Sequence, residues 1–207
     1  MNENRVKLDS KMQLLEGAKR VFARKGFERS TLIEITKEAG VQNKLIVYQF
    51  KGKDGLLSAV FQTFLPLSKI IWRNEINENP VDWLKKVIHE IVLLREKDPE
   101  ILSILQSEIS FSSIRGDLVD FYISSIWKEF RDVLVAGRSR GYFQFGSLEL
   151  TLSFVISSIF MYKKEFQTNN KFFSIDITTK ETIGLVLSAL NCPARGNKSL
   201  DLQEVSL

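Results

Sequence analysis

The sequence predicts an all-α protein, and three observations support this fold class. Apolar residues recur at the i, i+3 and i+4 spacing of an amphipathic helix through most of the 207 residues. Signals that begin helices, such as Asn79-Pro80 and Asp98-Pro99, stand between these runs. No strand-like alternation and no internal repeat is present. We expect about nine helices in two parts, residues 1–52 and residues 53–192, followed by a disordered tail at residues 193–207.

The first helix is expected after a flexible arm formed by residues 1–9. Ser10 and Gln13 have the spacing of a capping box, in which two side chains satisfy the first backbone N–H groups of a helix. One apolar face follows at helical spacing, formed by Leu14, Leu15, Ala18, Val21 and Phe22. Gly26 is expected to end the helix, because glycine adopts the left-handed conformation that closes many helices.

The stretch from Ser30 to Phe50 has the pattern of a helix-turn-helix. Thr31 and Glu34 form a second capping box, and Gly40 allows a tight corner before a third helix. That third helix presents a polar and aromatic edge, formed by Asn43, Lys44, Tyr48 and Gln49. Because this motif lays its second helix into the major groove, the pattern indicates a chain that binds DNA.

The charge distribution agrees with a polyanionic partner for the N-terminal part. The whole chain carries a net charge of +4. Residues 1–56 hold 12 Lys and Arg against 7 Asp and Glu, whereas the remaining residues hold 17 against 18. The basic excess therefore coincides with the helix-turn-helix. Charge alone leaves a second interpretation open, in which these residues only form a solvated face.

A string of spaced positions resembles the tetracycline-repressor-like (TetR/AcrR) family of bacterial transcriptional regulators. The matching positions read Leu14-Leu15-Glu16-x-Ala18-x-x-x-Phe22-Ala23-x-x-Gly26-Phe27, Ser30-Thr31-x-x-x-Ile35, Ala39-Gly40-Val41 and Tyr48-x-Phe50-x-x-Lys53-x-x-Leu56-Leu57. The resemblance implies a homodimeric repressor with a three-helix DNA-binding domain and an all-helical C-terminal domain. It further implies that a small effector bound to the C-terminal domain releases the protein from a pseudo-palindromic operator.

The resemblance also implies a set of DNA contacts. Phosphate contacts fall on Thr31, Tyr48 and Lys53, and base contacts on Asn43, Lys44 and Ile33. Hydroxyls, cations and helix N-termini suit phosphate oxygens, whereas Asn and Lys can reach base edges in the major groove. Two family hydroxyls are missing, because Leu45 and Val47 stand in their places. We expect Lys44, Lys51 and Gln49 to compensate for these hydroxyls, and Val47 to contact a thymine methyl group.

The C-terminal part is expected to contain a connecting helix, the effector site and the dimer interface. A long helix from Lys53 to Asn74 is expected to kink at Pro66, and another helix is expected at residues 117–139. The segment Leu148–Gln167 is apolar on nearly every side, so a monomer core or a dimer interface must cover it. A last helix is expected to be capped by Thr178. We predict a four-helix dimer interface that includes Phe154, Ser157, Ile183, Leu187 and Leu190.

The effector is expected to be aromatic or hydrophobic, because the C-terminal part is rich in aromatic residues. Those rings can equally fill the core. If Glu108 points inward, a cationic ligand is favoured, since a buried carboxylate needs a partner. The candidate effector contacts are His89, Gln106, Glu108, Phe111, Tyr122 and Phe130.

The composition argues against several other classes of protein. A single cysteine and a single histidine leave no intramolecular disulfide, no Cys/His zinc site and few catalytic constellations, so we expect no metal, cofactor or enzyme activity. No secretory signal and no span of about 20 apolar residues is present, which favours a cytoplasmic protein. One rival is a helical ligand-binding or protein-interaction module that no longer reads DNA. Another keeps DNA binding but replaces the small effector with a protein partner.

Overall fold

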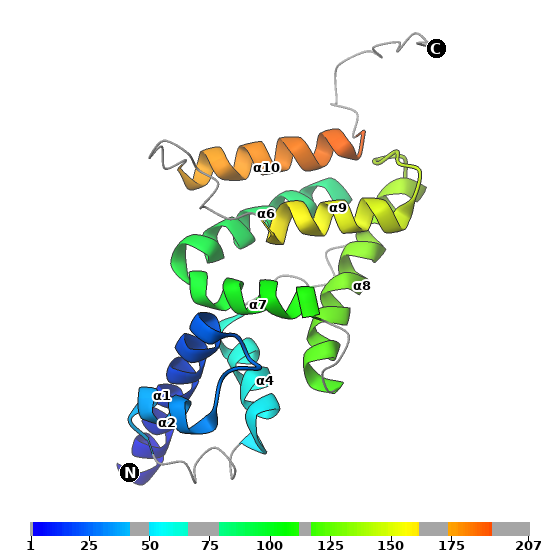
Figure 1. Ribbon diagram of the computed structural model, residues 1–207. Coiled ribbons are helices and arrows are strands. Elements are labelled where there is room, and N and C mark those ends of the chain that lie inside the picture. The colour runs from blue at the N-terminus through cyan, green and yellow to red at the C-terminus, as the bar shows by residue number, and fades with distance from the viewer. Residues whose placement is uncertain (1, 42–49, 66–78, 112–116, 162–173, 192–207) are drawn as a thin grey trace.

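A computed structural model describes residues 2–41, 50–65, 79–111, 117–161 and 174–191 of the chain (Figure 1). Within these ranges the chain forms eight helices and no strand, so the all-α prediction is confirmed. None of these helices is long and apolar enough to cross a membrane. The helices are α1 (Asn2–Lys25), α2 (Leu32–Ala39), α4 (Lys53–Phe64), α6 (Pro80–Lys97), α7 (Pro99–Phe111), α8 (Asp117–Ser139), α9 (Leu148–Phe160) and α10 (Ile175–Ala189).

Helix α1 is longer than the sequence indicated. It begins at Asn2, and residues 2–9 are helical. The predictions of a flexible arm at residues 1–9 and of a helix start at Ser10 are therefore wrong from Asn2 onward. The physical reason is that residues 2–16 contain neither glycine nor proline, and good helix formers extend the helix beyond an internal capping signal. The predicted apolar face is confirmed, because all five of its side chains are buried: Leu14, Leu15, Ala18, Val21 and Phe22.

The corner between α1 and α2 follows the predicted local rules. Gly26 adopts a φ of 76°, and its N–H donates to the Phe22 carbonyl at 2.8 Å, which closes α1. Thr31 caps α2 through the expected capping box with Glu34. Gly40 ends α2 in the left-handed region, with a φ of 66°. These three devices fix the length and the direction of α2 before any long-range packing is considered.

Close packing then holds α2 against α1. A Cβ atom placed on Gly17 of α1 would lie only 2.7 Å from the Cβ of Ala39 on α2. Glycine at this position therefore allows the two helices to approach more closely than any other residue would. Ile35 of α2 lies fully buried against the face of α1. Among the described helices, α2 makes its main contacts with α1.

Helix α4 ends where the sequence predicted only a kink. Its last residue is Phe64, and Leu65 has the extended dihedral angles φ −97° and ψ 98°. A residue before proline is pushed out of the helical region by the proline ring, so Pro66 stops α4 instead of bending it. The rest of the predicted Lys53–Asn74 helix lies outside the described residues.

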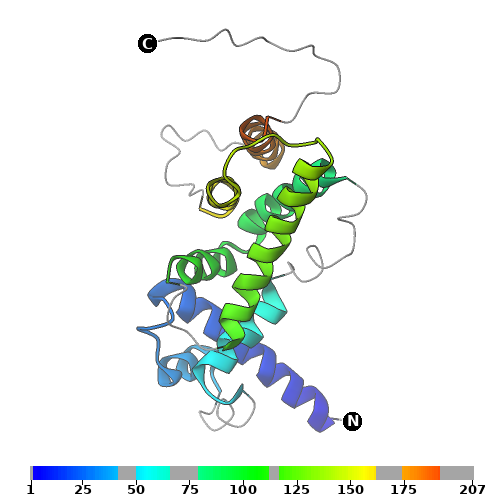
Figure 2. The same ribbon diagram turned by 90° about the vertical axis from the view of Figure 1, so that its right-hand side faces the viewer.

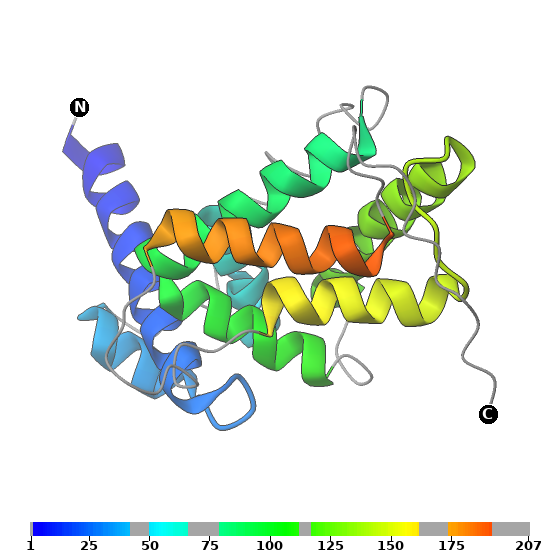
Figure 3. The same cartoon turned by 90° about the horizontal axis from the view of Figure 1, so that it is seen from above.

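The C-terminal helices form layers above α1, α2 and α4. Helix α7 lies between the N-terminal helices and the upper layers, and α8 runs along the length of the molecule (Figures 1 and 2). Seen from above, α9 and α10 lie side by side and antiparallel (Figure 3). Helix α1 packs against both α4 and α7, and α4 packs against α8, so α1 contacts the C-terminal part through two helices.

The helix starts in this part confirm three sequence signals and correct a fourth. The Asn79 side chain accepts from the Val81 N–H at 2.9 Å, and Asp98 accepts from the Ile101 N–H at 3.2 Å. Ser147 caps α9 as expected, accepting from the Leu150 N–H at 3.2 Å. The last helix begins earlier than predicted, because Ser174 provides its cap instead of Thr178.

The end of α9 also differs from the expected helix Leu148–Gln167. The helix stops at Phe160, where the N–H of the capping residue Met161 donates to the Ser157 carbonyl at 2.9 Å. Residues 162–173 lie outside the described part of the chain. The earlier stop depends on contacts from other helices to the last α9 carbonyls, which are described below.

Candidate functional site

Three of the eight predicted DNA contacts fall on described residues. Thr31 is the N-cap residue of α2, Ile33 lies on α2, and Lys53 begins α4. The other five lie outside the described residues: Asn43, Lys44, Val47, Tyr48 and Gln49. The structure therefore places the two helices that would carry the recognition helix, α2 before it and α4 after it.

The outer edge of α2 is open to a partner. Ile33 is 70% exposed, a large value for an apolar side chain of this size. Thr31 is also exposed, but its hydroxyl already has a role at the helix start. That hydroxyl accepts from the Glu34 N–H at 3.2 Å and lies 3.1 Å from the Glu34 carboxylate. The capping box thus orients Thr31 at the surface of the N-terminal part.

Ion pairs fix α2 to the end of α1. The Glu38 carboxylate accepts from Arg20 at 3.0 Å and from Arg24 at 3.3 Å, and Glu34 forms an ion pair with Lys25. The hydrogen bond from Arg20, followed by that from Arg24, lowers the pKa of Glu38. Lys25 and then Thr31 lower the pKa of Glu34.

The direction of these pKa shifts determines the pH range in which the ion pairs stabilise the fold. A carboxylate with a lowered folded-state pKa adds stability above its unfolded pKa of about 4.5, and this stability is lost as the pH falls through the folded value. The pairs are therefore intact at neutral pH.

Lys53 has a different environment from the one its predicted role requires. Its ammonium donates to the carbonyls of Phe27 at 2.9 Å, Ser30 at 3.1 Å and Glu28 at 3.4 Å. It also lies 4.3 Å from the centre of the Phe27 ring, a cation–π contact. An ammonium has three N–H donors, and each has a carbonyl partner here. Lys53 therefore ties the turn between α1 and α2 to the start of α4.

The same N-terminal helices match a known family. The family described as "Bacterial regulatory proteins, tetR family" matches residues 14–60, which run from α1 into α4. A curated relative from Bacillus subtilis (strain 168), "Probable HTH-type transcriptional regulator YttP", is 24% identical over 112 residues. The alignment covers 52% of this chain and 54% of that protein, so the chain spans about half the length of the relative. Residues 14–60 of the chain are thus similar to the TetR family.

Solved structures extend the likeness from the N-terminal helices to the fold of most of the chain. The structure of "HlyIIR, a Hemolysin II transcriptional Regulator" has a TM-score of 0.69 at 24% identity, covering 89% of this chain and 98% of that one. The transcriptional regulator FadR from Bacillus subtilis, solved in complex with stearoyl-CoA, has a TM-score of 0.67 at 19% identity. It covers 86% of this chain and 98% of that chain. At these identities the likeness shows the fold alone.

Of the predicted effector contacts, Phe130 fills the core of the C-terminal part. It is fully buried, and its ring packs edge-on against Trp83 of α6 at 5.2 Å and Phe160 of α9 at 6.0 Å between centroids. His89 lies partly exposed on α6. The side chains of Phe111 and Tyr122 lie outside the described residues. Phe130 thus packs α8 against α6 and α9. It would keep this packing role even if it also lined an effector pocket.

Gln106 and Glu108 do point inward, together with a residue that the sequence analysis missed. Glu108 is buried, and Gln106 donates to the Phe160 carbonyl at 2.5 Å. Arg95 of α6, also buried, donates to the Ile159 carbonyl at 2.6 Å. Two side chains from α6 and α7 therefore satisfy the last carbonyls of α9 and account for its end at Phe160. In the sequence, Arg95 continues the helical spacing of the apolar residues Leu84, Ile88 and Ile91. This spacing could have predicted that the Arg95 side chain is buried.

The predicted dimer residues divide between surface and core. Phe154, 45% exposed, and Ser157 lie at the surface of α9, whereas Ile183 and Leu187 of α10 are only partly buried. Leu190 is fully buried in the core of its own protomer, so it offers no surface to a partner. Leu190 is buried because it follows Val186 by one helical turn, on the side of α10 that faces the core.

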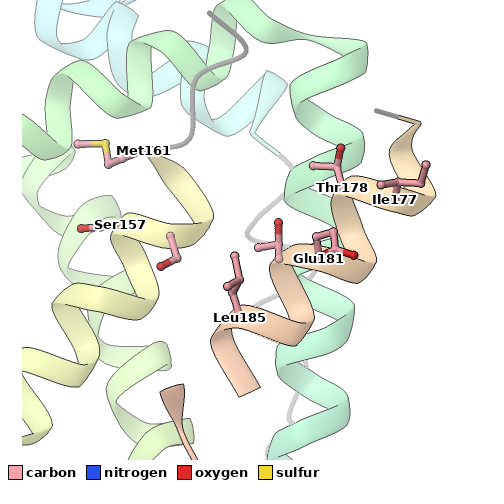
Figure 4. A pocket seen from close by; sticks show the side chains of 8 residues that line it. Ser157, Met161, Ile177, Thr178, Glu181 and Leu185 are labelled. Atoms are coloured by element: carbon pink, nitrogen blue, oxygen red, sulfur yellow. The ribbon is translucent and has the colours of Figure 1, made fainter. Parts of the chain in front are cut away.

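A groove runs between the outer faces of α9 and α10, with a volume of about 520 Å³ (Figure 4). Its most exposed apolar side chain is Leu185, at 66%. The sequence analysis missed this stripe on α10 because it assigned the apolar side chains of the inner face to the interface. The groove is lined by Ser157, Ser158, Met161, Ile177, Thr178, Glu181, Thr182 and Leu185.

Replacing Lys53 with Met tests its role. Lys53→Met keeps the aliphatic stem but leaves three carbonyls without their charged donor. We expect the free energy of unfolding to fall by about 1–3 kcal/mol, measured by urea unfolding. Lys37→Met, on the exposed face of α2, is the matched control and should change stability by less than about 0.5 kcal/mol.

The opposite result would return Lys53 to its predicted role. Unchanged stability, with weaker binding to every DNA sequence and a salt slope reduced by about one unit, would make the ammonium a phosphate contact.

Proposed function

We propose that this protein is a homodimeric TetR-family repressor that binds a pseudo-palindromic DNA operator and is released by a small-molecule effector. The observation that carries this proposal is the geometry of α1 and α2, capped by Thr31 and ended by Gly40, which would lead directly into a recognition helix. Each protomer would place one such helix in the major groove, with the two helices about 34–36 Å apart.

DNA contacts are assigned to the open edge of the N-terminal part. Ile33 on α2 and Thr31 at its N-cap lie exposed, where they would approach the DNA beside the recognition helix. Asn43, Lys44, Val47, Tyr48 and Gln49 remain the proposed contacts of that helix. We propose residues 1–52 as the DNA-binding domain and residues 53–192 as the effector-binding and dimerisation domain. No catalytic step is part of this function, and the bacterial cytoplasm, where the DNA lies, is its proposed location.

A second copy of the chain is the proposed cover for α9 and α10. Leu150, Phe154, Ile177 and Leu185 are exposed apolar side chains on these two helices. Two antiparallel helices from each protomer would form a four-helix interface around a twofold axis, with the same surface on both sides. Exposed small residues such as Ser157 would allow the helices of the two copies to approach closely.

The effector is proposed to bind among α6, α7 and α8. Gln106 and Glu108 point inward from α7 and bring polar groups into this region. The indole N–H of buried Trp83 meets no acceptor within the described part of the chain, so an acceptor on a ligand would satisfy it. We propose an effector with an apolar or aromatic body and a polar group. The similar FadR structure, which holds stearoyl-CoA, gives one candidate class to test.

The rival function is a helical module that no longer reads DNA. Its support is the absence of two hydroxyl side chains, because Leu45 and Val47 stand where the family resemblance leads us to expect them. A titration with the DNA that flanks the protein's own gene, repeated over a range of salt concentrations, separates the two functions. A specific complex supports the repressor, whereas equal binding to this DNA and to a scrambled duplex supports the rival.

Asn43→Ala is expected to relax sequence preference. An asparagine that bonds adenine in a bidentate way contributes about 1–3 kcal/mol of discrimination. The variant should therefore lose affinity for the specific duplex but keep its affinity for the scrambled duplex, measured by fluorescence anisotropy. Gln144→Ala, an exposed amide in the loop after α8, is the control that should change neither. An equal loss on both duplexes would remove Asn43 from the base contacts.

Leu185→Glu is expected to split the dimer. It places a charge in the centre of the proposed interface, where burial of an unpaired carboxylate is costly. Sedimentation equilibrium should show the wild type as a dimer and the variant as a folded monomer. Val135→Glu is the matched control, because Val135 is an exposed apolar residue on α8, outside the groove. A dimer that survives Leu185→Glu would contradict this interface.

A further inference from the structure

We propose that the partly buried ion pair between Lys19 and Asp98 is the contact through which the C-terminal domain sets the orientation of the DNA-binding helices. The role in DNA binding rests on the proposed function, whereas the ion pair itself joins the two parts of the chain directly. Lys19 lies on α1, and Asp98 lies at the corner between α6 and α7. Their charged groups approach to 2.6 Å. Lys19 is in this sense a positioning residue.

Lys19 is placed where a charge normally would not be. It is only 7% exposed, and a buried cation is costly unless it is paired. Two further acids stand near its ammonium, Glu16 at 3.4 Å and Glu100 at 3.8 Å. Burial alone lowers the pKa of Lys19, but Asp98 and these acids outweigh burial, so its pKa lies above the ordinary value. A raised lysine pKa keeps the pair charged up to alkaline pH, so it is intact at neutral pH.

The pair joins four helices at one point: α1, α4, α6 and α7. The Lys19 ammonium lies 4.4 Å from the centre of the Phe64 ring, at the end of α4. Asp98 binds Lys19 with one carboxylate oxygen and caps α7 with the other, accepting from the Ile101 N–H. Its own N–H donates to the Leu94 carbonyl and closes α6. One side chain thus fixes the end of α6, the start of α7 and a cation of α1.

This arrangement gives a physical route between the two domains. A ligand that shifts α6 or α7 must move Asp98, because Asp98 belongs to both helix termini. Lys19 then either follows Asp98, which carries α1 with it, or loses its nearest acid while it stays buried. Because α2 is fixed to α1 by close packing and ion pairs, a movement of α1 is a movement of the DNA-binding helices. The two helix arrangements would supply the two states that an effector selects between.

Two spin labels within one protomer test this coupling directly. Lys37→Cys on α2 and Val135→Cys on α8 carry the labels, with Cys192→Ser to remove the natural thiol, and labelled protein is diluted with unlabelled protein. Pulsed electron paramagnetic resonance then gives the distribution of distances between the two parts. With Lys19 present we expect a narrow distribution, and Lys19→Met should shift or broaden it. Lys85→Met, which removes a local ion pair on α6, should leave the distribution unchanged.

A second variant keeps the test valid if Lys19→Met fails to fold. Lys19→Met combined with Asp98→Asn removes both charges, so no buried charge is left alone, and the amide oxygen can still cap α7. This variant should regain the wild-type midpoint of urea unfolding and still show the shifted or broadened distribution. A distribution like that of the wild type, in either folded variant, overturns the proposal. The measurement requires no DNA, so a failure to bind an operator would not affect its result.

Discussion

The packing of α1 is the constraint on which the rest of the structure depends. Helix α2 has only eight residues, and isolated helices of that length are not stable in water. It persists because Ile35 lies against the apolar face of α1, because Gly17 lets Ala39 approach closely, and because Glu38 bonds two arginines of α1. Helix α4 packs on the same helix, and α7 joins it from the C-terminal side. A rigid α1 is therefore the condition for a correctly placed recognition helix.

Charged groups in the N-terminal part are used mainly to hold the helices together. The acids of α2 pair with bases of α1, Lys53 donates to the carbonyls of the first turn, and Lys19 of α1 pairs with Asp98 between α6 and α7. Lysines with neighbours of this kind cannot be assumed to face DNA merely because they lie in a DNA-binding domain. The net positive charge still attracts a polyanion over a distance, whereas the structural pairs decide the geometry that meets it.

Local sequence rules predicted much of this fold, because helix termini depend on a few neighbouring residues. Thr31 with Glu34, Gly26, Gly40, Asn79 and Asp98 all cap or end helices as their residue types indicate. The errors arose where two local signals compete or where a distant helix decides. Ser174 replaces Thr178 as a cap one turn earlier, and Pro66 ends α4 where the apolar spacing continues past it.

For the candidate sites too, sequence-based prediction was limited where contacts with distant helices decide whether a residue is buried. Spacing identified Phe130 and Leu190 as apolar positions, but only the packing of α6, α8, α9 and α10 shows that both lie in the protomer's core. No pattern within the N-terminal sequence could reveal that Lys53 meets three carbonyls more than 20 residues earlier. Arg95 was detectable in principle, since it continues an apolar helix face, and a cation on such a face has to find buried acceptors.

A hydroxyl-radical footprint on the DNA that flanks the protein's own gene tests the central claim most directly. Two protomers joined through α9 and α10, each with a recognition helix supported by α1, should protect two dyad-related half-sites about one helical turn apart, 10–10.5 base pairs centre to centre, or a multiple of that. A single protected stretch without dyad symmetry, or uniform weak protection at every salt concentration, would contradict the account.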